Sequence, residues 1–221
     1  MIQSGSSSIA DVKFGSQQIA KVCYGSDLVW EKDVWEEHTF PNSSEYFTSS
    51  DLLGFELQAN PKSTTSYLYQ IMDSNVSQNQ TQLATLDTAS DANNGRMGWL
   101  GIRFPTEWGT VKIKNFNINQ WGNIYRYKIF SSTDRNLELS TSYNPLDGEV
   151  KIFEKASSNM SSSTYYRPTV NGTEQDVAAR MLRLAGDQRS TSYNLIYLGN
   201  FTLTFLIKKS CYNAWKARYF S

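Results

Sequence analysis

The sequence predicts an all-β protein, on the evidence of its composition and of its short apolar segments. Aromatic residues make up 14% of the 221 residues, with Tyr the commonest at 13, whereas charged residues make up 19%. Tyr, Phe, Trp and Thr favour strands, and Asn, Ser and Gly favour the turns between them. From about Leu52 onward, short apolar runs alternate with such turns, as in a β-sandwich. The strongest helical candidate is residues 175–184, so we expect helix to be a minor component.

The chain opens with an internal repeat. Residues 9–18 are followed at once by residues 19–28, in which Ile, Ala, Val, Gly and Ser recur at the same places. Each unit reads as a short strand ended by Gly-Ser, because Gly permits the positive φ of a tight hairpin. An isolated hairpin of this size is only marginally stable in water. Its apolar face therefore needs a partner surface, which is either the main domain or another chain. The anchor residues that we predict are Ile9, Val12, Phe14, Ile19, Val22, Tyr24, Val29 and Trp30.

The pattern Val-x-x-Gly-Ser…Ile-x-Lys-Val-x-Tyr-Gly-Ser-x-Leu-Val-Trp, which ends at Trp30, resembles the N-terminal segment of many tailed-phage structural proteins. These include proteins of phages of gut Bacteroidetes and Firmicutes, crAss-like phages among them. There the segment accompanies head fibres, tail fibres and other virion-surface proteins. One departure is Cys23, where an aliphatic or aromatic residue is usual; Cys is a conservative change at a small buried position. The resemblance implies an anchor in residues 1–30 that binds other virion proteins.

The rest of the chain divides into a linker, residues 31–50, and a head domain, residues 51–221. The linker has mixed charge, Pro41 and a polar cluster, and it contains His38, which we expect to face solvent. The expected strands are residues 55–59, 67–72, 97–104, 111–118, 125–131, 149–154, 179–184 and 195–208. In residues 111–118 the alternation is broken, because Val111 and Ile113 share one face while Phe116 shares the other. A bulge or bend near Asn115 would reconcile them.

Several head-domain segments resemble, in their order and spacing, the galactose-binding-like, discoidin-type jelly roll of many carbohydrate-binding modules. The family has a Trp-containing strand, a Tyr…Ser-x-Asp strand, an Arg-rich strand and a late Gly followed by an alternating strand. The matching segments here are residues 98–105, 111–114, 125–134, 180–184 and 197–203. The resemblance implies a jelly-roll sandwich over roughly residues 55–208.

Strand direction indicates which loops share an end of such a sandwich. If the strands at 97–104, 111–118 and 125–131 alternate in direction, the turn 105–110, with Trp108, shares one end with residues 132–136. The loop 87–96 then shares the opposite end with the turn 119–123. In discoidin-like lectins this second pair of loops, with a loop near the last strand that matches residues 186–193, forms the glycan site.

A glycan site needs a flat aromatic for the apolar sugar face and planar polar groups for the hydroxyls. Trp121 would be the platform, and the alternative is that it caps the barrel above ordinary turns. The sequence also departs from the lectin pattern, since the early loop lacks its His and Asn119 or Gln120 replaces an Arg. The ligand-binding residues that we predict are Arg96, Asn119, Trp121, Asn123, Arg189 and Tyr193.

The charge balance argues against two classes of partner. There are 21 Lys plus Arg and 21 Asp plus Glu, so the formal net charge is zero and no broad positive field exists for a phosphate backbone or an anionic membrane. No apolar run reaches the roughly 18–20 residues that cross a bilayer, and no basic-then-apolar leader opens the chain. We expect neither nucleic-acid binding nor membrane insertion.

Catalytic and metal sites find little support. Cys23, Cys211 and the single His38 cannot make a disulfide framework or a four-ligand zinc site, and a catalytic triad would have to use His38. We therefore expect no enzyme, cofactor or metal. Two alternatives stay open: Asp134 with Glu138 as a glycan-cleaving pair rather than surface charge, and a calcium ion in the oxygen-rich loop 87–91.

The sequence thus predicts a phage virion structural protein, made in the host cytoplasm and assembled into the virion as a homo-oligomer. Its role would be that of a head fibre, decoration protein or tail-associated adhesin, with a jelly roll that is structural or binds a host-surface glycan. The first alternative is a stand-alone carbohydrate-binding module in which the N-terminal repeat supplies two edge strands of one sandwich. The weaker alternative is a subunit of a capsule or cell-wall hydrolase.

Overall fold

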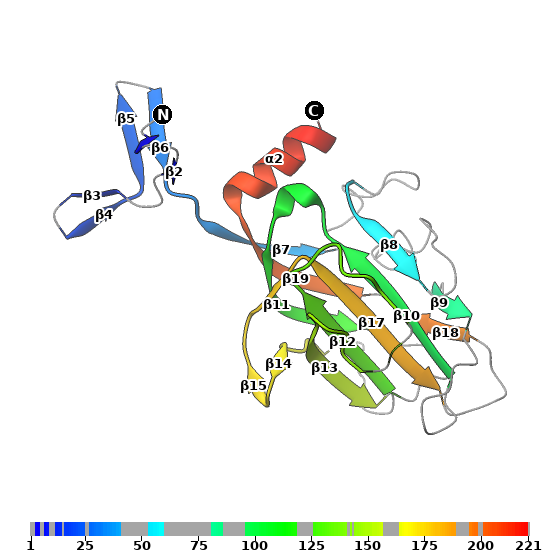
Figure 1. The fold of residues 1–221 in the computed structure, drawn as a ribbon. Coiled ribbons are helices and arrows are strands. Elements are labelled where there is room, and N and C mark those ends of the chain that lie inside the picture. The colour runs from blue at the N-terminus through cyan, green and yellow to red at the C-terminus, as the bar shows by residue number, and fades with distance from the viewer. Residues whose placement is uncertain are drawn as a thin grey trace.

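Two antiparallel sheets face each other to form the body of the protein (Figure 1). The structure is a computed structural model that describes residues 3–4, 7–8, 12–14, 16–24, 27–40, 53–59, 81–85, 96–118, 126–140, 142, 144–156, 164–188, 195–198 and 201–220. The five-stranded sheet has the order β13 (Val150–Ala156), β12 (Arg126–Ser132), β17 (Met181–Gln188), β10 (Arg96–Arg103) and β8 (Glu56–Ala59). The four-stranded sheet has the order β16 (Val177–Ala179), β11 (Val111–Ile118), β19 (Phe201–Lys208) and β7 (Trp35–Phe40). The all-β sandwich expected from the sequence is confirmed.

The remaining elements are small. Outside the two sheets, the paired short strands are β1 (Gln3–Ser4) with β2 (Ser7–Ser8), β3 (Val12–Phe14) with β4 (Gln17–Ile19), β5 (Lys21–Tyr24) with β6 (Asp27–Glu31), β9 (Thr81–Thr85) with β18 (Leu195–Leu198), and β14 (Thr169–Val170) with β15 (Thr173–Glu174). In the residues that the structure describes, the helical elements are the 3-10 turn η2 (Thr106–Trp108) and the helix α2 (Lys209–Tyr219). None of the helices in the described part of the chain has the length and hydropathy needed to cross a membrane.

The central strands of the five-stranded sheet, β12, β17 and β10, have buried side chains on both faces. Leu100 and Ile102 of β10 point into the main core between the sheets. Trp99 points the other way, into a second cluster that includes Leu139 from the segment after β12. Between them, Gly101 leaves the space that this segment needs, because a Cβ there would lie 2.1 Å from the Leu139 side chain. Gly101 therefore makes room for Leu139 where this segment crosses the outer face of the sheet.

The irregularity predicted near Asn115 is present. The register between β11 and β19 shifts between Ile113 and Asn115. An extra residue in one strand reverses the side-chain alternation beyond it. As a result Val111, Ile113 and Phe116 all reach the main core, each with at most 1% of its surface exposed.

The helix α2 was missed from the sequence, and the helical candidate at residues 175–184 is wrong. That segment forms β16 and β17 instead, since its alternating apolar side chains fit strands in the two sheets. In α2, Tyr212, Trp215 and Tyr219 lie three and four residues apart and so share one helix face. Trp215 is fully buried, and its Nε1–H donates to the carbonyl of Leu53 at 2.8 Å.

Part of the predicted linker belongs to the sandwich. Residues 35–40 form β7, the edge strand that pairs with β19 from Trp35–Lys208 to Phe40–Leu203. The linker prediction is wrong for these residues because a polar edge strand, solvated on one side, carries little apolar periodicity. The expected solvent-facing His38 is also wrong, since its ring stacks on Tyr212 at 3.8 Å between centroids.

The N-terminal repeat folds as two hairpins that project away from the sandwich (Figure 1). The pairs Phe14–Gln17 and Tyr24–Asp27 close two-residue loops at the two Gly-Ser positions, as the repeat predicted. None of β1–β6 is a member of either large sheet, so the repeat does not supply the two edge strands that the stand-alone carbohydrate-binding module reading expected of it.

The base of these hairpins is tied to the start of α2. The Asp33 carboxylate accepts a hydrogen bond from the backbone N–H of Ser210 at 3.1 Å, which satisfies a donor of the first helical turn. The Lys208 ammonium donates to the Asp33 carbonyl at 3.1 Å, and the Lys209 N–H donates to the carbonyl of Val34 at 2.9 Å. The segment between β6 and β7 is therefore held at three points.

Candidate functional site

The strand register brings the loop-bearing strand ends to one end of the sandwich. Arg96, which begins β10, is paired with Gln188, which ends β17. Arg126, which begins β12, is paired with the neighbouring Asp187. At the opposite end Met181 is paired with residues of both β10 and β12. The alternation of strand directions predicted from the sequence is confirmed.

The predicted ligand-binding residues flank the strand ends that meet here. Arg96 is the first residue of β10, Asn119 follows β11, and Arg189 follows β17. Trp121 and Asn123 belong to the connection between β11 and β12, and Tyr193 belongs to the connection between β17 and β18. Asn119, Trp121, Asn123, Arg189 and Tyr193 lie outside the described residues, as does the early loop 87–95, and of Arg96 only the backbone is described. Their role in binding stays a prediction.

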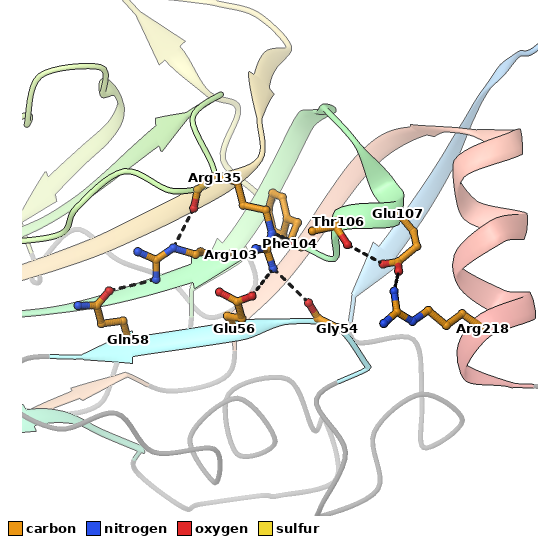
Figure 2. Close-up of polar contacts among 9 residues, drawn as sticks. All are labelled: Gly54, Glu56, Gln58, Arg103, Phe104, Thr106, Glu107, Arg135 and Arg218. Carbon is orange, nitrogen blue, oxygen red and sulfur yellow. Dashed lines mark hydrogen bonds and ion pairs between the residues drawn. The ribbon is translucent and has the colours of Figure 1, made fainter.

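At the opposite end, two arginines tie the turn after β12 to β8 and β10 (Figure 2). The Arg135 guanidinium donates to the carbonyl of Phe104 at 2.6 Å and pairs with the Glu56 carboxylate at 2.8 Å. The Arg103 guanidinium donates to the carbonyl of Arg135 at 2.8 Å and to the Gln58 side chain at 3.0 Å. Both guanidinium groups are thus bound by acceptors within the protein. The contacts at this end connect the turn after β12 to β8 and β10.

The same end also joins η2 to α2. Figure 2 shows the carboxylate of Glu107 between the Thr106 hydroxyl and the Arg218 guanidinium, each of which donates to it. Burial opposes ionisation of Glu107, but the hydrogen bonds from its own backbone, Arg218 and Thr106, with the positive charge of Arg218, lower the pKa of this carboxyl. Glu107 is therefore ionised at neutral pH, and its contact with Arg218 is an ion pair between η2 and α2.

Trp108 is a core residue and not an exposed turn residue. The sequence predicts a turn at residues 105–110, but the side chain of Trp108 is 1% exposed. The 3-10 turn η2 points the indole inward, where it packs edge-on against Trp215 at 5.2 Å between centroids. Trp108 is buried because Trp215 of α2 packs against it.

The two carboxylates considered for glycan cleavage are both exposed. Asp134 accepts a hydrogen bond from the backbone N–H of Asn136 at 2.9 Å, which is a turn-stabilising contact. Among the described residues no group of three or more His, Cys, Asp or Glu side chains could hold a metal ion. The loop 87–91, considered for calcium, lies outside those residues.

His38, which was expected to face solvent, is partly buried. Its Nε2 is buried, has no hydrogen-bond partner among the described residues, and lies 3.9 Å from the Glu36 carboxylate. Burial lowers the pKa of His38 below its ordinary value of 6.5; the Glu36 charge opposes this effect and the Lys216 charge adds to it. The neutral imidazole is therefore the form that packs under α2.

We expect stability to fall as the pH is lowered below about 6.5. In the unfolded chain His38 takes up a proton at its ordinary pKa, whereas in the folded chain it resists protonation, so acid favours unfolding. The thermal midpoint of His38→Phe should therefore decrease less between pH 7.5 and 5 than that of the wild type. Equal decreases in the two proteins, measured by circular dichroism, would show that the loss arises from other groups.

Comparison with known proteins gives similarities of fold only. No family model matches the sequence, and no curated protein sequence matches it. Among solved structures, the chain is similar to the C-terminal domain of a chitobiase from Bacteroides fragilis, with a TM-score of 0.43 and 12% identity over 70% of this chain and 95% of that one. It is similar to chitosan-binding module 1 of a chitosanase/glucanase from a Paenibacillus species, with a TM-score of 0.40 and 12% identity over 68% of this chain and 94% of that one.

A third similar structure is a family 32 carbohydrate-binding module from C. perfringens in complex with galactose. The TM-score is 0.36, with 8% identity over 68% of this chain and 93% of that one. The sheets and registers described above define this chain as a two-sheet antiparallel β-sandwich, and the structures it is similar to include modules that bind carbohydrate.

Proposed function

We propose that the sandwich is a carbohydrate-binding module whose ligand site is the end at which β10 and β12 begin. The observation that carries this proposal is the pairing of Arg96 with Gln188 and of Arg126 with Asp187. It gathers at one end the strand termini from which most of the predicted binding residues extend. The opposite end is occupied by the Arg103 and Arg135 contacts and by η2 under α2, which leaves the loop-bearing end for a ligand.

A Trp121→Ala variant should lose glycan binding while the thermal midpoint stays nearly unchanged. An indole stacked on a sugar supplies the apolar part of the contact, and a connection residue removes little core area. Isothermal titration with galactose and with chito-oligosaccharides measures the loss, and the same incubations should release no reducing ends because we propose binding without hydrolysis. Reducing ends whose release disappears in Asp134→Asn or Glu138→Gln would overturn that second part.

The matched control is Trp35→Ala. Trp35 is 37% exposed and begins β7, which places it at the end opposite the predicted site. Its loss should leave glycan binding intact. A large fall in stability with binding retained in Trp121→Ala would show that Trp121 caps the barrel, and equal losses of binding in both variants would contradict the assignment of the two ends.

We further propose that the N-terminal hairpins attach this module to a phage particle, as part of a head fibre, decoration protein or tail-associated adhesin. The specific observation is the exposure of two large apolar side chains on the arm, Phe14 at 80% and Tyr24 at 83%. Contacts among β3–β6 are chiefly within each hairpin, so these rings have no sandwich surface to cover them. Apolar side chains exposed on small hairpins, together with the resemblance of this segment to phage proteins, support binding to other virion proteins.

Repetition on a particle would suit a weak glycan site. Millimolar sugar binding corresponds to only about 4 kcal/mol, but linked copies that engage together gain roughly 10²- to 10⁴-fold. A homo-oligomer held through the arm would supply that repetition.

Deletion of residues 1–30 should leave a folded sandwich that no longer joins its assembly. The deletion removes the hairpins but keeps Asp33, which caps α2. The thermal midpoint is expected to stay close to that of the full chain, whereas co-sedimentation with particles that lack this protein should be lost. A double variant, Phe14→Ser with Tyr24→Ser, which changes one residue in each hairpin, should reproduce the loss. Gln17→Ala with Gln18→Ala, on the first hairpin, is its control. An unfolded truncated protein would show that the hairpins belong to the main core.

A further inference from the structure

A cleft of about 1110 Å³ lies on the side of the sandwich, between β13 and the β14–β15 hairpin. β13 is the edge strand of the five-stranded sheet, and the β14–β15 hairpin lies near it (Figure 1). The hairpin follows a segment that bridges to β11 through Tyr166 and Phe116. The Gln175 N–H donates to the carbonyl of Pro168 at 3.0 Å and closes the base of the hairpin. One wall of the cleft is therefore β13, which belongs to the five-stranded sheet. The other wall is the β14–β15 hairpin, whose preceding segment is paired with β11.

Two adjacent tyrosines line this cleft. The ring of Tyr166 is held against Phe153 at 5.0 Å and Phe116 at 6.2 Å between centroids. The ring of Tyr165 is 57% exposed and has no ring contact or hydrogen bond with any described residue. A fixed aromatic next to an exposed one, in a concave surface, is the arrangement on which apolar sugar faces stack.

The charges of the cleft balance. Its lining contains three basic residues, Lys151, Lys155 and Arg167, and three acidic residues, Glu149, Glu154 and Glu174. Most of them are paired within the protein, as in Lys151–Glu154 at 2.5 Å, Arg167–Asp176 at 2.9 Å and Glu149–Arg183 at 2.5 Å. A lining without net charge favours neither a polyanion nor a polycation.

Two charged side chains of the lining have no ion pair among the described residues. The Lys155 ammonium lies 5.4 Å from the centroid of the Tyr166 ring, and Glu174 is exposed on the hairpin. One supplies hydrogen-bond donors and the other supplies acceptors, which are the groups that hydroxyls need.

We propose that this cleft is a second binding site, one that takes a neutral oligosaccharide of several sugar units along β13. Sites for compact ligands enclose about 300–1,000 Å³, so a cleft at or above the top of that range is too large for a single sugar. Tyr165 is the ring on which a sugar stacks, and Lys155 and Glu174 orient the sugar by hydrogen bonds to its hydroxyls. The inference rests on the function proposed above only for the class of ligand, since the residues and the place are different.

The test uses the full chain and its variants Tyr165→Ala, Tyr165→Phe, Lys155→Met and Trp121→Ala. The probes are the N-acetylglucosamine hexamer, its monomer and a hyaluronan hexasaccharide, titrated by calorimetry and followed by the NMR signals of Lys155 and Glu174. Trp121→Ala should still bind the hexamer at this site, better than the monomer and no more weakly than the negatively charged hyaluronan. Tyr165→Ala should weaken this binding about tenfold or more, while Tyr165→Phe, which keeps the ring, should retain it.

Each of the following results would contradict one of the two proposed binding sites. If Trp121→Ala abolishes all hexamer binding and Tyr165→Ala leaves it unchanged, the cleft is not a site and the loop-bearing end is. If Tyr165→Ala abolishes all binding and Trp121→Ala has no effect, the cleft is the site and the function proposed for the loops fails. Absence of binding to every probe at millimolar concentration overturns both. Thermal melts exclude misfolding, because Tyr165 and Lys155 are exposed and their replacement should leave the midpoint unchanged.

Discussion

Replacement of Trp108 by alanine is expected to destabilise the protein by about 3–5 kcal/mol, the cost of removing a fully buried Trp side chain. The indole is 1% exposed and packs within 5.1 Å of Phe55 and 4.9 Å of Phe205, measured between ring centroids. It also contacts Trp215, so the cavity would loosen β19 and α2 together. For a chain of this size the thermal midpoint should fall by roughly 10 °C.

Trp35→Ala is the control for this change, since the same side chain is removed from a partly exposed position. Its effect on the free energy of unfolding should be small, although the cations of Lys112 and Lys208 lie 4.7 and 4.9 Å from the ring centroid. Urea denaturation of both variants measures the difference. Similar losses in the two variants would show that the aromatic cluster under α2 is not the centre of stability that its burial indicates.

Removal of the Glu149 carboxylate is the second large effect that we expect. Glu149 and Arg183 pair at 2.5 Å with both side chains fully buried, and Arg183 also donates to the carbonyls of Ser142 and Asn144. Glu149→Ala should cost about 3–5 kcal/mol, because it leaves a buried guanidinium without its counter-charge. Replacement of both residues, Glu149→Gln with Arg183→Met, should recover much of that loss, since an apolar side chain has no charge to desolvate.

An exposed ion pair gives the comparison. The pair between Lys114 and Glu37 joins β11 to β7 with both side chains more than a third exposed. Glu37→Gln should therefore change the free energy of unfolding by less than about 1 kcal/mol. If Glu149→Ala costs no more than Glu37→Gln in urea, the buried pair is not what holds the segment after β12 on the sheet.

Local patterns in the sequence predicted a large part of this fold. The bulge in β11 could be predicted because it breaks a period of two within a single strand, and the sharing of ends by loops follows from strand direction alone. The two hairpins could be predicted because Gly-Ser recurs at a fixed spacing. Each of these features depends on residues close together in the chain.

The features that were missed depend on partners far away in the sequence. β7 is a strand because β19, more than 160 residues later, offers it an edge. Trp108 is buried because α2 covers η2, and His38 is half-buried because it meets Tyr212 of the same helix. The spacing of Tyr212, Trp215 and Tyr219 was a readable helical signal, but it follows directly on a strong strand. For the candidate site, the sequence predicted which end of the sandwich carries the loops. It could not predict the cleft, because β13 and the β14–β15 hairpin that line it belong to different sheets.

The attachment of Asp33 and Val34 to the start of α2 places the N-terminal arm and the loop-bearing end at opposite ends of the sandwich. The arm leaves the sandwich at Trp35, where β19 ends, whereas the loop-bearing end is where β19 begins, at Phe201 opposite Ile118. Three hydrogen bonds attach the base of the arm, at Asp33 and Val34, to the end of β19 and the start of α2. If a particle binds the arm as we propose, the predicted glycan loops lie at the far end of each sandwich from that particle.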